Sequence, residues 1–181
     1  YFCSGRKRVI QNQKIVLLGP MGVGKSTIGK ILAAKFGWNY FDNDLQMTER
    51  FSYTQAELSS MNVDKLHELE SRYLHEILAE PAPFITGAAA SVVDEESNLK
   101  ILKANTSIYL RIPLDLVIAR AGSTGVGRQA LNADAQKVLT DRYKRRDPLY
   151  RASSKFTLDL GTDPNSDALS ITEFLQAQIQ S

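Results

Sequence analysis

The stretch LLGPMGVGKST, from Leu17 to Thr27, decides how this chain folds. Residues 19–26 within it match the pattern G-x-x-x-x-G-K-[ST] at every fixed position. The apolar run KIVLLG at 14–19 leads into it and is rich in β-branched side chains, which predicts a buried parallel strand. The residues that follow predict a helix over 25–36, with Gly37 at its C-cap. A strand, a glycine-rich turn and a helix in this order indicate a loop that binds phosphate.

The residue types in this loop explain how it would bind a nucleotide. Glycines let the backbone approach phosphate oxygens with N–H groups pointing inward, and the N-terminus of the helix adds partial positive charge. Lys25 is expected to reach the β- and γ-phosphates, and the Ser26 hydroxyl to ligate Mg²⁺. The alternative, a glycine-rich turn without nucleotide, is disfavoured because the complete motif stands between a strand and a helix. The predicted nucleotide-binding residues of the loop are Gly22, Val23, Gly24, Lys25, Ser26 and Thr27.

Beyond the loop, apolar runs and helical periodicities alternate along the chain. Strands are predicted at 14–19, 38–44, 83–88, 107–113 and 155–160. Helices are predicted at 25–36, 94–104, 114–121, 132–146 and 167–179, and 54–80 is predicted to form two helices broken near 61–63. This alternation predicts an α/β domain with a parallel sheet and right-handed crossovers. Glycines at 122, 125 and 127 interrupt it and suit a mobile lid over about 121–132.

Length and composition limit the classes of function. A chain of 181 residues suits one domain, so we expect a single domain over 13–181 after an N-terminal arm or tag remnant at 1–12. The net charge of +2 gives no general attraction to nucleic acid, and no apolar run approaches the ~20 residues that span a membrane. We expect no nucleic-acid partner, no membrane partner, and a monomer that binds a small molecule.

Two acids follow the second predicted strand, in the sequence FDND. Asp42 and Asp44 lie at the carboxyl end of that strand, the edge at which open α/β sheets bind ligands. In an extended segment their i, i+2 spacing directs both side chains to one face, where one carboxylate would face a metal and the other an acceptor hydroxyl. The structural alternative is that Asp44, which precedes LQMTERF, caps a helix. Spacing alone leaves both interpretations open.

Taken together in this order, GPMGVGKSTIGKILA, FDND and RRDPLY at 145–150 resemble segments of the shikimate kinases. The resemblance covers about residues 13–178, nearly the whole chain. It implies a three-layer α/β/α P-loop kinase fold with a central five-stranded parallel sheet and a mobile lid. It also implies a transferase of aromatic amino acid biosynthesis that uses ATP and Mg²⁺ to phosphorylate the 3-hydroxyl of shikimate. Such enzymes are cytoplasmic in bacteria and plastidic in plants, so we expect the cytoplasm, or a plastid if the source is a plant.

The same resemblance implies roles for individual side chains. Asp42 would join Ser26 in the Mg²⁺ shell. Lys25, Asp44 and Arg128 would form the catalytic set. In that set Asp44 would hold the acceptor hydroxyls and accept a proton. Arg128 would swing over the phosphates as a lid arginine, which suits a loose phosphoryl-transfer transition state.

Further arginines would bind the two substrates. Arg146 matches the family arginine that holds the acceptor carboxylate, a role that suits a planar guanidinium making two parallel hydrogen bonds. Arg120 and Pro164 would lie on the nucleotide side, with Pro164 in the loop GTDPNSD at 161–167 that packs on adenine. From the residues alone, Arg146 in its KRR run also fits a solvated helix face, and Arg128 also fits an ordinary loop arginine.

The acceptor side departs from the family pattern at two places. Where the family has three glycines after the central strand, this chain has Gly87, Ala88 and Ala89. A loop that needs positive φ there would be changed or narrowed by the added methyl groups. His67 stands where a second carboxylate-binding arginine belongs, and an imidazole cannot make the same two-pronged contact. The predicted substrate-binding residues are Asp44, His67, Gly87, Ala88, Ala89 and Arg146.

Two hypotheses about function follow. The first is an ATP-dependent kinase of the shikimate kinase type, which transfers the γ-phosphoryl group to a hydroxyl of shikimate or a related hydroxy-acid. The second is a catalytically weak or inactive domain of the same kind, which binds nucleotide or a small ligand as a sensor or interaction module. A GTPase or motor ATPase is disfavoured because the chain has no N-K-x-D run and no long apolar strand that ends in Asp-Glu.

Overall fold

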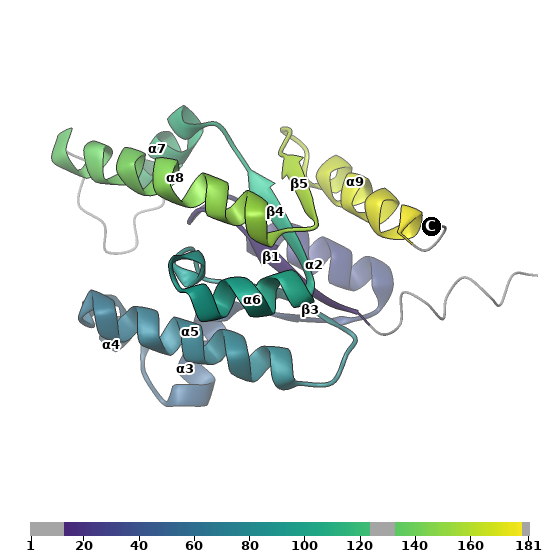
Figure 1. Ribbon diagram of the computed structural model, residues 1–181, viewed down its shortest axis with the longest axis horizontal. Helices are drawn as coiled ribbons and strands as arrows, with labels where there is room; N and C mark the ends of the chain where they lie inside the picture. Colours follow the sequence, from purple (N-terminus) through teal and green to yellow (C-terminus); the bar gives the residue numbers. More distant parts are fainter. Residues whose placement is uncertain (1–12, 124–132, 179–181) are drawn as a thin grey trace, which may run out of the picture.

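Strands and helices alternate along the chain in the computed structural model, which describes residues 13–123 and 133–178 (Figure 1). Most of the predicted lid, including Arg128, lies outside the described residues, as does the N-terminal arm. The elements are β1 (Lys14–Leu18), α2 (Lys25–Phe36), β2 (Asn39–Phe41), α3 (Asn43–Phe51), α4 (Gln55–Ser60), α5 (Val63–Ala79), β3 (Phe84–Gly87), the 3₁₀ helix η1 (Val92–Asp94), α6 (Glu96–Ala104), β4 (Thr106–Arg111), α7 (Leu114–Ser123), α8 (Ala133–Ser153), β5 (Phe156–Asp159) and α9 (Pro164–Ala177).

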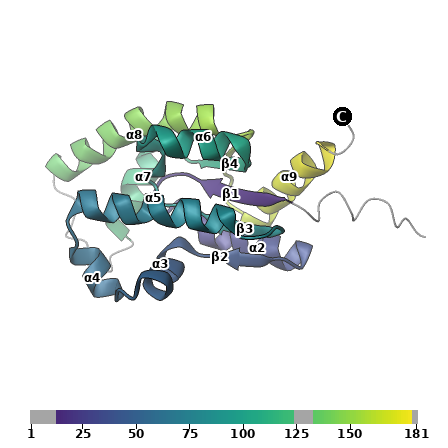
Figure 2. The ribbon, with the colours of Figure 1, turned by 60° about the horizontal axis from the view of Figure 1, so that its bottom comes forward.

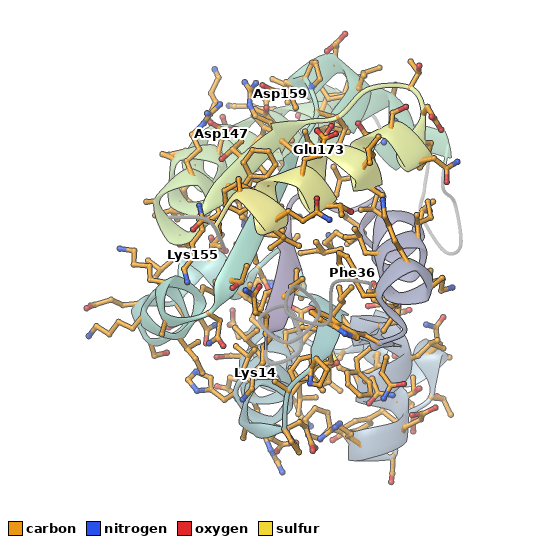
Figure 3. All side chains as sticks on the ribbon, turned by 90° about the vertical axis from the view of Figure 1, so that its right-hand side faces the viewer. Lys14, Phe36, Asp147, Lys155, Asp159 and Glu173 are labelled. Atoms are coloured by element: carbon orange, nitrogen blue, oxygen red, sulfur yellow. The ribbon has the colours of Figure 1, made fainter. Side chains whose placement is uncertain are left out.

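The five strands form one sheet in the order β2-β3-β1-β4-β5, and every neighbouring pair is parallel. Strand β1 is central, with Ile15 opposite Ile85 of β3 and Thr106 of β4. Because all strands run the same way, their carboxyl ends meet at one edge, where α/β sheets bind ligands. Figure 3 looks toward the opposite edge, at which Lys14 begins β1 and Lys155 precedes β5.

Helices cover both faces of the sheet, as a parallel sheet requires. Alternate residues of β1 explain the two layers: Ile15 and Leu17 pack with α2 and α9, whereas Val16 and Leu18 pack with α5 and α6. All four of these side chains are fully buried, and each such burial stabilises the fold by about 1.5–3 kcal/mol. Figure 2 shows α5, α6 and α8 together on one side of the sheet. The fold is therefore the expected three-layer α/β/α arrangement around a five-stranded parallel sheet.

Three predicted boundaries are wrong, each for a local reason. The strand predicted over 38–44 ends at Phe41, because Asp42 already caps α3. Helix α8 does not end near residue 146 but continues through Pro148 to Ser153, and the burial of Tyr150 and Ser153 compensates for the hydrogen bond that proline cannot make. Helix α9 begins three residues earlier than predicted, because the Asp163 carboxylate accepts hydrogen bonds from the first free N–H groups.

No helix in the described part of the chain has both the length and the apolar character needed to cross a membrane.

Candidate active site

The loop between β1 and α2 has the backbone that its glycines predict. Gly19, Gly22 and Gly24 all have positive φ. A Cβ at Gly19 would lie 2.5 Å from the carbonyl oxygen of Leu110 in β4, so only glycine fits there. No side chain caps the N-terminus of α2, which leaves its first N–H groups directed at the loop. The loop is therefore built as a concave set of backbone donors, the arrangement that binds anions.

Lys25, the first residue of α2, folds its side chain over this loop. Its Nζ atom donates to the carbonyl oxygens of Gly19 at 2.8 Å and of Pro20 at 3.0 Å. Burial lowers the pKa of Lys25 to about 8, against the opposing effect of the Asp44 and Asp42 carboxylates. The ammonium thus lies among loop carbonyls and carboxylates, where an anionic phosphate would strengthen its charged form.

Ser26 and Asp42 bring two oxygen ligands together from different elements. The Ser26 hydroxyl donates to Asp42 Oδ2 at 2.6 Å. Asp42 Oδ1 accepts the backbone N–H of Asp44 at 3.2 Å, which makes Asp42 the N-cap of α3. Both sequence interpretations of FDND are therefore wrong in detail: the segment is not extended through Asp44, and the cap is Asp42 rather than Asp44. A hydroxyl beside a carboxylate is the kind of oxygen pair that holds Mg²⁺ with nucleotide phosphates, so these residues fit the ion.

Tyr40 of β2 belongs to this site, although no motif in the sequence pointed to it. Its ring packs directly against Gly29 of α2. A Cβ on that glycine would overlap the Cε2 atom of the Tyr40 ring. Its hydroxyl would be 2.7 Å from a Cβ on Gly87. Burial raises the pKa of Tyr40, and its hydroxyl interacts with Ser26 and Asp42. The i, i+2 spacing from Tyr40 to Asp42 was the signal that could have placed it here.

Ala88 and Ala89, which follow β3, do not have positive φ, so their methyl groups do not strain the backbone of this loop. The Ala88 N–H donates to the carbonyl oxygen of Leu17 at 3.0 Å. The Ala88 side chain is buried in the cluster that contains Val16, and Ala89 packs against that cluster. Among the described non-glycine residues only Ser52 has positive φ. Both alanines are therefore accommodated in ordinary backbone conformations.

Arg146 of α8 does not lie on a solvated helix face, since its side chain is only 11% exposed. Its Nη2 donates to Asp94 Oδ2 at 2.6 Å, and its Nε lies 3.1 Å from both carboxylate oxygens. Burial alone would raise the pKa of Asp94, but the hydrogen bonds and charge of Arg146 outweigh it and hold that pKa below its usual value. The arginine thus makes the two-pronged contact with a carboxylate that its role predicts, but with a carboxylate of this chain.

Glu70 of α5 interacts electrostatically with Lys25 of the loop and with Arg146. It accepts a hydrogen bond from the Ser91 hydroxyl. Burial raises the pKa of Glu70, and the charges of His67, Asp44 and Arg146 also act on it. His67 is half-buried, and its charge acts on Asp94 as well as on Glu70.

A hollow of about 90 Å³ lies beside the loop. Val23, Gly24 and Thr27 line it from the loop and α2, and Pro164 lines it from the start of α9. Arg120 of α7 also lines it and donates to the carbonyl oxygen of Val23 at 3.2 Å. Of the predicted nucleotide-binding residues, the hollow is lined by Val23, Gly24, Thr27, Arg120 and Pro164.

Comparisons with known proteins agree with this geometry. The family model described as shikimate kinase matches residues 21–176. A shikimate kinase of Chromohalobacter salexigens is 29% identical over 141 residues, covering 77% of this chain and 78% of that protein. A shikimate kinase of Neisseria gonorrhoeae is 26% identical over 149 residues, covering 82% of this chain and 88% of that protein.

Solved structures show the same fold. A shikimate kinase from Acinetobacter baumannii in complex with shikimate superimposes with a TM-score of 0.84 at 23% identity, covering 95% of this chain and 98% of that one. A gluconokinase from Sinorhizobium meliloti has a TM-score of 0.60 at 14% identity, covering 93% and 96% of the two chains. Because the family model matches residues 21–176, which are most of this chain, the chain belongs to the shikimate kinase family.

Proposed function

We propose that this protein is an ATP-dependent kinase that transfers the γ-phosphoryl group of ATP to a hydroxyl of shikimate or a related hydroxy-acid. The observation that carries the proposal is the contact of the Ser26 hydroxyl in the phosphate-binding loop with Asp42 Oδ2 at 2.6 Å, in a chain that the shikimate kinase family model matches over residues 21–176. The charge of Glu70 acts on both Lys25 and Arg146, which supports a shared space between the phosphate-binding loop and the arginine that binds a carboxylate. A phosphate donor and a carboxylated acceptor would meet there.

The chemistry assigned to this space is an in-line displacement. The acceptor hydroxyl oxygen forms a bond to the γ-phosphorus. At the same time the bond breaks between that phosphorus and the oxygen that bridges it to the β-phosphorus, and ADP leaves. Asp44 is proposed to accept the hydroxyl proton, and Lys25 to stabilise the charge that develops on the phosphates. Mg²⁺ bound through Ser26 and Asp42 would neutralise phosphate charge. The lid arginine, Arg128, is proposed to complete the site.

The nucleotide side of the proposal rests on the hollow beside Val23. Arg120 and Pro164 flank it, together with Thr27 at the start of α2. We propose that the adenine ring lies there, on the opposite side of the loop from Arg146. We further propose a monomer located in the cytoplasm, or in a plastid if the source is a plant.

A coupled assay of ADP release, with shikimate, ATP and Mg²⁺, tests the function. We expect turnover that depends on shikimate and that Lys25→Met abolishes, with the product identified as a phosphate monoester by ³¹P NMR. No release above background with shikimate or a panel of hydroxy-acids would contradict the proposal. Nothing in the described residues favours the alternative of a nucleotide-binding module without catalysis.

A further inference from the structure

The Arg146 guanidinium, which the proposed function assigns to the acceptor, is already engaged by the chain itself. Asp94, at the end of η1, meets it with both carboxylate oxygens, at 2.6 Å from Nη2 and 3.1 Å from Nε. The two side chains are only 11% and 19% exposed. This planar, two-pronged contact is the one that an acceptor carboxylate would use.

Asp94 is held firmly in that position. Its backbone N–H donates to the Ser91 carbonyl oxygen at 2.9 Å, and the two preceding valines of η1 are buried in the core. Arg145 donates to the same Oδ2 atom at 3.0 Å. Because Asp94 is tethered beside Arg146, its effective concentration there far exceeds that of any free acceptor.

Two further acids act near the Asp94–Arg146 pair and repel a second carboxylate. Glu70 acts on Arg146 from α5, and Asp44 acts on Glu70 from α3. His67 acts on both Glu70 and Asp94. An acceptor carboxylate that entered without moving Asp94 would meet repulsion rather than a free guanidinium.

We propose that Asp94 is a specificity-determining residue that competes with the acceptor's carboxylate for Arg146. This inference rests on the proposed function, because it concerns how the acceptor enters the same site. A carboxylated acceptor must displace Asp94 to reach the guanidinium, which weakens its binding. An acceptor without a carboxylate does not depend on that exchange.

The experiment compares wild type with Asp94→Asn in the full chain, using shikimate and its neutral carboxamide as acceptors. We expect the KM for shikimate to fall about tenfold in Asp94→Asn, because its carboxylate no longer has to displace a charged competitor from Arg146. The KM for the carboxamide should stay unchanged. Asp159→Asn is the matched control, since it also removes a carboxylate paired with an arginine, Arg111, but at a 72% exposed position. It should leave both KM values unchanged.

A second variant keeps the test decisive. Asp94→Ser provides a second variant if Asp94→Asn lowers the melting temperature too far for assay. An unchanged or higher KM for shikimate, or an equal change for both acceptors, would overturn the inference and leave Asp94 as a residue that merely orients Arg146.

Calorimetric titration of shikimate into the protein saturated with ADP and Mg²⁺ separates the inference from the proposed function. Tighter binding in Asp94→Asn without turnover in either protein would support the competition and contradict the kinase activity on shikimate. Turnover by wild type with equal binding in both proteins would support the activity and overturn the competition. Absence of both binding and turnover in all variants would overturn both.

Discussion

At the scale of single residues, Lys25 combines a buried ammonium with a pKa of about 8, lowered mainly by burial. At pH 9 the free protein therefore holds this side chain mostly neutral, whereas bound phosphates favour its charged form. We expect ATP binding at pH 9 to take up close to one proton, and ATP affinity to fall as the pH rises above about 8. Calorimetry in two buffers of different ionisation enthalpy measures the uptake.

The control for that prediction is Lys25→Arg, because a guanidinium stays charged throughout this range. It should bind ATP without taking up the proton. The same uptake in the arginine variant would assign the titration to another group and remove the role given to Lys25.

Arg145 and Arg146 form a matched pair on one carboxylate, since both donate to Asp94 Oδ2. The side chain of Arg145 is 61% exposed and that of Arg146 only 11%. We expect Arg146→Ala to lower the free energy of unfolding by about 2 kcal/mol, because Asp94 loses its buried partner. Arg145→Ala should cost less than about 1 kcal/mol. Urea unfolding of both variants measures the difference, and equal losses would show that burial does not set the strength of this cluster.

At the scale of elements, α2 and β2 are fitted together through one glycine. A Cβ on Gly29 would lie closer to the Tyr40 ring than two non-bonded atoms can approach. Gly29→Ala therefore has two opposing effects, an increase in helix propensity of about 1 kcal/mol and a steric clash. We expect the clash to win, with a net loss of about 1–3 kcal/mol in unfolding free energy.

A double-mutant cycle with Tyr40→Ala isolates the contact. In the Tyr40→Ala background the same glycine substitution should become neutral or stabilising, because only the improved helix propensity remains. Thermal or urea unfolding of the four proteins gives the coupling energy. A loss of the same size in both backgrounds would mean that Gly29 is needed for something other than Tyr40.

At the scale of the whole molecule, the parallel sheet places the two halves of the site. Because parallel strands end together, the segments that follow β1, β2 and β3 all leave the same edge of the sheet. They are the phosphate-binding loop, the N-cap of α3 and the turn at Ala88. Helix α8 then brings Arg146 to that edge from the other end of the sequence, 52 residues beyond its partner Asp94.

The phosphate-binding loop and the order of strands and helices could be predicted from the sequence, because both depend on local patterns. The positive φ values at Gly19 and Gly24 follow from a motif of eight residues, and the five strands follow from short apolar runs. Boundaries were predicted less well where a cap such as Asp42 ended one element and began the next.

Only the tertiary structure decided what each functional side chain contacts. The sequence alone left open whether Arg146 faced solvent or the interior, and it offered no sign that Asp94 would pair with the Arg146 guanidinium. It also offered no reason why residue 87 stays glycine while residue 88 is alanine. The Tyr40 hydroxyl fills the space beside Gly87, and the Ala88 methyl turns into the core. Such contacts join residues far apart in the chain, so they depend on how whole elements pack and not on any local pattern.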